Sequence, residues 1–177
     1  MTLPASATIN TGFGAIAIHQ QTGLLKIDLL GNHISEPTVS QDPVDQGPVV
    51  QDAVVQHPIV HHPSFKQMTQ EILAYLQQPH QAFSLPAQLA GSAFQQKVWL
   101  AILAIPLGQT RTYSELAAQL QSGPRAVANA CGANRLPLLI PCHRVVAKNG
   151  LGGFMRGDKN GLSIKRWLLA HEGVHVY

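Results

Sequence analysis

The sequence is poor in charge and in cysteine. Only 12% of its 177 residues are Asp, Glu, Lys or Arg, whereas 45% are hydrophobic. This composition is typical of a globular chain and excludes a disordered one. The two cysteines, Cys131 and Cys142, are too few for a disulfide scaffold, and no Cys-x-x-Cys pair exists that could begin a zinc site. We therefore expect two free thiols.

Long apolar runs and a targeting segment are also missing. No stretch approaches the ~20 consecutive apolar residues of a membrane helix. Residues 1–6 lack the basic start and apolar core of a secretory signal, and the chain has no nuclear-type basic cluster. We expect a soluble protein of a bacterial cytoplasm, without a membrane partner.

The charge that is present is unevenly distributed. From Gly91 onward, ten Lys and Arg stand against three acids, a formal charge of +7; before Gly91, two Lys stand against six acids, a charge of −4. A basic half beside an acidic half predicts that the C-terminal half contacts a polyanion such as a nucleic acid. A merely solvated basic face is the alternative.

The N-terminal half carries few structural signals. Alternating apolar residues around a Gly-containing turn predict a β-hairpin with strands at 13–18 and 24–30. Five prolines between residues 34 and 63 predict an extended loop, with one short strand near 59–60. His57, His61 and His62 lie in that loop, but without a cysteine or acid at ligand spacing they indicate a polar loop more than a metal site.

A helix is predicted from Phe65 to Gln77, because apolar residues recur there at helical spacing, Ser64 can cap it and Pro79 stops it. Residues 81–91 then form a linker. We therefore predict an N-terminal domain of residues 1–88 and a C-terminal domain of residues 89–177.

The C-terminal half is predicted to be mostly helical. One helix starts after Ser92. A second is capped by Thr112, with Glu115 at the capping-box position. After Gly123, Pro124 begins a third helix that extends to residue 134, which completes a helix-turn-helix. This last helix is rich in alanine, which favours close approach to a shallow groove, although close packing of two helices would explain the same small residues.

Cys142 is followed directly by His143 and Arg144. A neighbouring His and cations favour the thiolate, which is the nucleophilic form. The alternatives are an inert apolar cysteine and a cysteine hydrolase, for which adjacent Cys and His are poor geometry.

The run from Pro141 to Val145 resembles the active-site signature of the O6-alkylguanine-DNA alkyltransferase family. Further matching motifs stand in the same order and spacing at residues 94–99, 105–108, 113–117, 134–137 and 167–173. The resemblance is strong over residues 91–173 and loose over residues 1–90. It implies an α+β fold, with a small antiparallel sheet and helix (ribonuclease H-like) followed by a mostly helical winged-helix or helix-turn-helix DNA-binding domain.

The resemblance also implies residue roles. Cys142 would accept the alkyl group, His143 would take the thiol proton through a water, Glu172 would hold His143, and Asn134 would bond to backbone around the cysteine. Tyr113 would rotate the nucleotide and assist the leaving guanine, and Arg125 would fill the gap in the duplex. The remaining substrate- or DNA-binding residues would be Ser92, Ala126 and Val145.

The implied function is direct, stoichiometric transfer of an alkyl group from O6-alkylguanine in duplex DNA, with O4-alkylthymine as a further candidate substrate. We expect one turnover, no metal, no cofactor and a monomer. The competing readings are a non-catalytic damage-recognition protein, disfavoured because Cys142 is present, and a helix-turn-helix regulator. Residues 154–164, the loop expected to close over the flipped base, are longer than is usual in the family. The conformation of this loop and the size of alkyl group that it admits are therefore not predicted.

Overall fold

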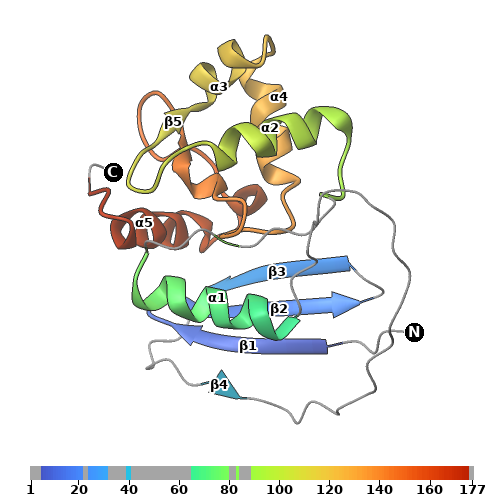
Figure 1. Cartoon of the computed structure of the whole chain (residues 1–177). Coiled ribbons are helices and arrows are strands. Elements are labelled where there is room, and N and C mark those ends of the chain that lie inside the picture. The colour runs from blue at the N-terminus through green and yellow to red at the C-terminus, as the bar shows by residue number, and fades with distance from the viewer. Residues whose placement is uncertain are drawn as a thin grey trace, which may run out of the picture.

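The computed structural model describes residues 5–21, 24–31, 39–40, 65–79, 83 and 89–175. Its N-terminal part is an antiparallel sheet of four strands in the order β3-β2-β1-β4. The strands are β1 (Ala5–Thr11), β2 (Gly14–Gln21), β3 (Leu24–Gly31) and β4 (Val39–Ser40). Helix α1 (Phe65–Gln77) lies against this sheet (Figure 1).

The sheet forms because apolar side chains alternate along its strands. Ile9 pairs with Ile16, and Ile18 pairs with Ile27, across neighbouring strands. All four are buried, together with Met68 and other residues of α1. The predicted hairpin and the helix at 65–77 are confirmed, whereas β1 and β4 were not predicted.

The C-terminal part is mostly helical and lies above the sheet in Figure 1. Its elements are α2 (Ala93–Leu103), β5 (Arg111–Thr112), α3 (Tyr113–Gln119), α4 (Pro124–Gly132), the 3-10 turn η1 (Cys142–Arg144), β6 (Val145–Val146), the 3-10 turn η2 (Met155–Gly157) and α5 (Gly161–His171). Strands β5 and β6 pair in parallel, with Arg111 opposite Val145, so the start of α3 is tied to the segment that follows Cys142.

Local capping chemistry explains where these helices begin. Ser92 and Thr112 each accept a hydrogen bond from the backbone three residues on and complete a capping box. Gly123 precedes α4, which starts at Pro124. The predicted helix-turn-helix arrangement of α3 and α4 is therefore present, although α4 ends at Gly132 and not at residue 134. The names ribonuclease H-like and winged helix, and the domain boundary at residue 88, stay predictions.

One further difference concerns residues 154–164. The segment 154–164 was expected to be a loop, but α5 begins inside it at Gly161. That start requires a glycine, because a Cβ at Gly161 would lie 2.9 Å from the Phe154 carbonyl oxygen. The predictions for Ser64, for the histidines of the 34–63 loop and for a strand near 59–60 fall outside the described residues.

The two parts contact each other closely. The Ile27 amide of β3 donates to the Arg135 carbonyl at 3.0 Å. Phe13 packs edge-on against Trp167 of α5, with ring centroids 4.9 Å apart. One wall of the functional site is therefore part of the sheet. Within the described residues, no helix has the length and apolarity needed to cross a membrane.

Candidate active site

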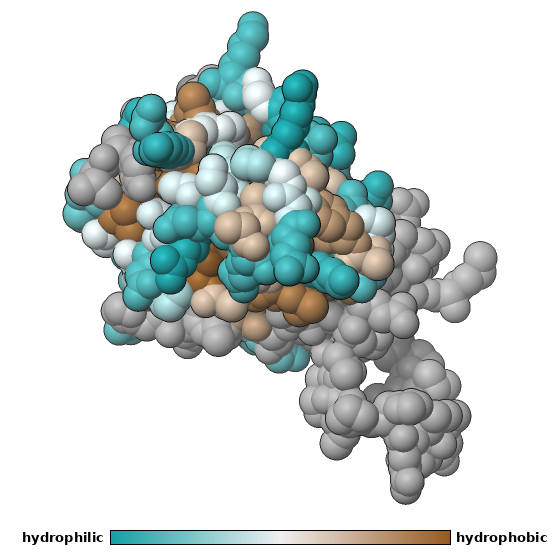
Figure 2. All heavy atoms as spheres, turned by 90° about the horizontal axis from the view of Figure 1, so that it is seen from above, coloured by the Kyte–Doolittle hydropathy of each residue, from teal (hydrophilic) through white to brown (hydrophobic). Residues whose placement is uncertain are grey.

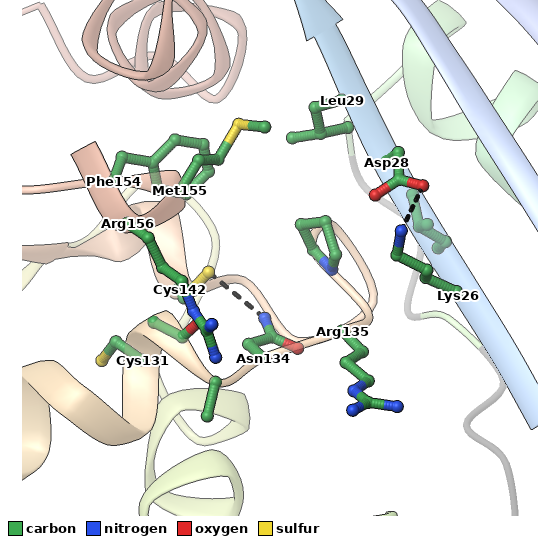
Figure 3. Close-up of a pocket in the computed structure, with 14 residues that line it drawn as sticks. Lys26, Asp28, Leu29, Cys131, Asn134, Arg135, Cys142, Phe154, Met155 and Arg156 are labelled. Atoms are coloured by element: carbon green, nitrogen blue, oxygen red, sulfur yellow. Dashed lines mark hydrogen bonds and ion pairs between the residues drawn. The ribbon is translucent and has the colours of Figure 1, made fainter. Parts of the chain in front are cut away.

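Cys142 lies at the start of η1, with 8% of its surface exposed. It lines a cavity of about 510 Å³ between β3 and the C-terminal part of the molecule. Figure 3 shows this cavity, with Asp28 and Lys26 on the strand side and Cys142 opposite them. The other lining residues come from β3, from the end of α4 and the residues up to 137, and from residues 154–156: Ile27, Leu29, Cys131, Gly132, Ala133, Asn134, Arg135, Pro137, Phe154, Met155 and Arg156. Cys142 thus lines a cavity that is large enough for a small ligand.

Asn134 fixes the segment that leads to Cys142. Its Nδ2 donates to the Ile140 carbonyl at 2.9 Å and to Cys142 Sγ at 3.2 Å, and its Oδ1 accepts from the Leu136 amide at 2.9 Å. The dashed line in Figure 3 marks the contact with sulfur. One amide side chain therefore holds both the backbone before the cysteine and the sulfur itself.

His143 and Glu172 form a buried pair. His143 Nε2 lies 2.9 Å from Glu172 Oε1, and their side chains are 1% and 0% exposed. Burial alone would raise the pKa of Glu172, but hydrogen bonds from His143 and Arg144 hold it well below its usual range. An ionised carboxylate only accepts, so the neutral His143 carries its proton on Nε2 and leaves Nδ1 as the basic nitrogen.

Nδ1 of His143 is buried and has no hydrogen-bond partner among the described residues. Burial lowers the pKa of His143, against the opposing pull of Glu172, so the ring is held neutral. A neutral, buried and unbonded ring nitrogen beside a cysteine is chemically suited to take a proton.

Arg144 and Tyr75 also donate hydrogen bonds to the Glu172 carboxylate. Arg144 donates Nε to Oε2 at 2.8 Å and NH2 to Oε1 at 2.9 Å, and its NH1 donates to the Ile105 carbonyl at 2.7 Å. The Tyr75 hydroxyl of α1 donates to Oε1 at 2.9 Å. Neither role was found from the sequence. Arg144 follows His143 directly and could have been considered, but Tyr75 is 97 residues from Glu172 and carries no local signal.

As expected of a neighbouring cation, Lys165 favours the Cys142 thiolate, but burial has the larger and opposite effect. Burial raises the pKa of the Cys142 thiol, and this outweighs the lowering by the Asn134 hydrogen bond and by the charge of Lys165. The resting site holds a thiol.

Lys165 of α5 is a third residue whose role the sequence did not reveal. Its side chain is fully buried, and its Nζ donates to the Val145 carbonyl at 2.6 Å and to the Gly153 carbonyl at 3.1 Å. Burial lowers the pKa of Lys165 to about 8. The Lys165 ammonium group thus links the segment at Val145 to the segment at Gly153. Its positive charge favours a thiolate at Cys142.

Tyr113 begins α3, and its hydroxyl donates to the Gly153 carbonyl at 3.1 Å. Burial raises the pKa of Tyr113 above its ordinary value, so the hydroxyl keeps its proton. Gly152 must be glycine here, because it has a φ of +68° and a Cβ would lie 2.9 Å from the Tyr113 ring. The loop around Gly153 is thereby held against the start of α3.

The other predicted residues lie apart from the cavity. Arg125 is exposed in the first turn of α4 and Ala126 beside it is half-buried. Seen from the side where α2, α3 and α4 lie, hydrophilic side chains surround a paler area of less polar ones (Figure 2). The Ser92 hydroxyl caps α2, and the Val145 side chain is fully buried, with its carbonyl bonded to Lys165.

The arrangement therefore presents a buried sulfur to the cavity and places an imidazole nitrogen without a hydrogen-bond partner on the next residue. No group of three His, Cys, Asp or Glu side chains in the described part of the chain could hold a metal ion. Cys131 is half-buried on α4, and burial raises the pKa of this thiol to about 12. Of the two thiols, only Cys142 contacts Asn134 and adjoins the His143–Glu172 pair.

Comparison with known proteins agrees with this geometry. A probable methylated-DNA–protein-cysteine methyltransferase of Acanthamoeba polyphaga mimivirus is 50% identical over 91 residues, which cover 50% of this chain and 58% of the relative. The chain spans about half or less of the length of other curated relatives that it matches.

Two solved structures resemble the whole fold. The crystal structure of the Mycobacterium tuberculosis O6-methylguanine methyltransferase matches with a TM-score of 0.68 and 25% identity, and covers 99% of this chain and 96% of that one. A crystal structure of Mycobacterium tuberculosis OGT in complex with DNA has a TM-score of 0.66 and 27% identity, with coverage of 95% and 92%. Residues 93–174 match the family model described as 6-O-methylguanine DNA methyltransferase, DNA binding domain. Somewhat less than half of the chain therefore resembles the DNA-binding domain of the 6-O-methylguanine DNA methyltransferase family.

Proposed function

We propose that this protein repairs alkylated DNA by moving an alkyl group, above all methyl, from O6 of guanine to Sγ of Cys142. The observation that carries the proposal is the Cys142 thiol in the wall of a cavity, bonded by Asn134 and followed by the buried His143–Glu172 pair. The names of the mimivirus and Mycobacterium tuberculosis relatives support the same chemistry.

The first step is loss of the thiol proton. His143 Nδ1 takes it through a bridging water, a role that suits a buried polar atom without a protein partner. Glu172 keeps the ring in the required tautomer and stabilises the imidazolium that forms. Asn134 and Lys165 stabilise the sulfur as it becomes negative.

The second step is an in-line displacement. A bond forms between sulfur and the alkyl carbon, the bond from that carbon to O6 breaks, and its electron pair stays with the guanine. The hydroxyl of Tyr113, which stays protonated at neutral pH because its pKa is raised, donates a hydrogen bond to the departing guanine, and the proton taken from the thiol returns through water to neutralise the guanine anion. The Tyr113 hydroxyl exchanges its bond to the Gly153 carbonyl for one to the purine.

The substrate is double-stranded DNA. O6 of guanine faces the interior of the base stack, so the nucleotide must be flipped out. The alanine-rich helix α4 lies in the minor groove through Ala126 and its neighbours, and Arg125 occupies the place of the flipped base. The net charge of +7 from Gly91 onward favours this contact. Ser92 and the backbone of Val145 belong to the same binding surface.

A thioether has no easy leaving group, so each molecule acts once. We propose a monomer without a cofactor, acting in a bacterial cytoplasm, with O4-alkylthymine as a further candidate substrate. A ribonuclease H-like domain to residue 88 and a winged-helix domain from residue 89 form part of the same proposal.

The test uses a duplex oligonucleotide that carries radiolabelled O6-methylguanine. Label should move to the protein, up to one equivalent, and should not move to Cys142→Ala. Cys131→Ala is the matched control and should react like the parent protein. Transfer to Cys142→Ala would refute the assignment. Binding without any transfer to the parent protein would instead favour a damage-recognition protein.

A further inference from the structure

The N-terminal helix α1 contributes a side chain to the buried network behind Cys142. The Tyr75 hydroxyl donates to Glu172 Oε1 at 2.9 Å, and the Tyr75 ring is 1% exposed. His171 Nε2 lies 2.9 Å from the Tyr75 carbonyl, and the rings of these two residues meet edge to face. The end of α1 is therefore fastened to the end of α5, where Glu172 stands.

Glu172 Oε1 is a shared acceptor. It receives hydrogen bonds from His143, Arg144 and Tyr75, while Oε2 receives one from Arg144. Tyr75 is uncharged, and its hydroxyl keeps its proton at every ordinary pH because burial and the adjacent carboxylate raise its pKa. Each donor that bonds to an oxygen reduces the basicity that this oxygen offers to the others.

We propose that Tyr75 is a positioning residue for the alkyl transfer, because its hydroxyl holds the Glu172 carboxylate and limits how strongly that carboxylate attracts the proton of His143. The inference rests on the proposed function and deepens it. The N-terminal part of the chain then lowers the proton affinity of His143, the proposed general base, in addition to forming one wall of the cavity. A merely structural reading treats the same hydroxyl as a way to satisfy a buried carboxylate.

The two readings differ in what happens to His143 when the hydroxyl is removed. The charged and titratable groups that act on His143 are Glu172, Arg144 and Lys165. Glu172 favours the imidazolium, while Arg144 and Lys165 oppose it. Without the Tyr75 hydroxyl, the Glu172 carboxylate is less neutralised and stabilises the imidazolium more. The pKa of His143 must then rise, so the ring is protonated, and useless as a base, up to a higher pH.

Tyr75→Phe tests this inference, because it removes one oxygen and keeps the ring packed against Phe83 and His171. Single-turnover transfer of methyl from the O6-methylguanine duplex is measured from pH 5 to pH 8.5. The acid limb of the rate profile should move up by about one pH unit. The rate would then fall about tenfold at the acid end and change little at the alkaline end.

The matched control is Thr69→Val. It removes another hydroxyl from α1, one that donates to the Phe65 carbonyl at 2.9 Å and does not contact Glu172. Its acid limb should coincide with that of the parent protein, and thermal unfolding shows whether both variants are folded. A Tyr75→Phe profile that drops uniformly, or that coincides with the parent, overturns the inference while leaving the proposed function intact. No transfer by the parent protein overturns both.

Discussion

Replacement of Glu172 by glutamine tests the buried network most directly. The carboxylate accepts four hydrogen bonds, two from Arg144 and one each from His143 and Tyr75. Glutamine has the same shape but only one acceptor oxygen. Its NH2 group would point at N–H groups of Arg144 or His143, which are donors too and cannot accept a hydrogen bond from it. At least one buried donor is left unbonded, and the guanidinium loses its counter-charge.

The magnitude follows from the burial of the pair. Removing one partner of a buried ion pair costs about 3–5 kcal/mol. The Glu172 side chain is 0% exposed and that of Arg144 is 12% exposed, so partial hydration of Arg144 places the loss near the lower end, about 3 kcal/mol. A domain is stable by about 5–15 kcal/mol. The variant should fold, with a clearly lower free energy of unfolding.

Urea unfolding at pH 7 measures this loss. Glu115→Gln is the control, because Glu115 is also a carboxylate with local hydrogen bonds to Thr112, but it lies on the surface. Its effect should be much smaller than that of Glu172→Gln. A loss below about 1 kcal/mol for Glu172→Gln would refute the reasoning, since that is the value expected for an exposed pair.

Three further predictions concern pH, the sulfur and DNA. His143 and Glu172 both have folded-state pKa values below their ordinary ones, so the unfolded chain binds more protons in acid; the melting temperature should fall as the pH drops below about 6.5 and fall further below about 4.5, and a flat profile would contradict this. Lys165→Met, made in a Cys131→Ala background, should raise the pKa of Cys142 by about one unit, measured from the pH dependence of thiol alkylation; an unchanged pKa would exclude an electrostatic role for Lys165. Arg125→Ala should slow repair in duplex DNA far more than reaction with free O6-benzylguanine, and equal losses on both substrates would argue against insertion of Arg125 into the duplex.

Local patterns made much of the fold predictable. The helix at Phe65–Gln77, the helix that starts after Ser92 and the capping box at Thr112 depend on residues within a few positions of each other, and all were confirmed. Strand β1 was missed because its sequence has small and polar residues with Ile9 as its one large apolar side chain. It becomes a strand through its pairing with β2, which a local pattern does not reveal.

The site was predictable only in part, for the same reason. Cys142 and His143 are adjacent, but the partners of His143 and of the thiol come from distant segments. Tyr75 and Lys165 reach the site because α1 and α5 pack against the same core. The pKa of the Cys142 thiol was likewise not predictable from its neighbours in sequence, because burial has the largest effect on it in the folded chain.

That protonated resting state has a consequence for an acceptor that acts once. If each molecule transfers a single alkyl group, any other reaction of its sulfur leaves that molecule unable to repair DNA. Oxidation and alkylation both attack the thiolate in preference to the thiol. A cysteine that is 8% exposed and held as a thiol is therefore protected. In the proposed reaction it becomes a thiolate only when His143 Nδ1 takes its proton. Burial of the sulfur therefore keeps it unreacted until an alkylated nucleobase occupies the cavity.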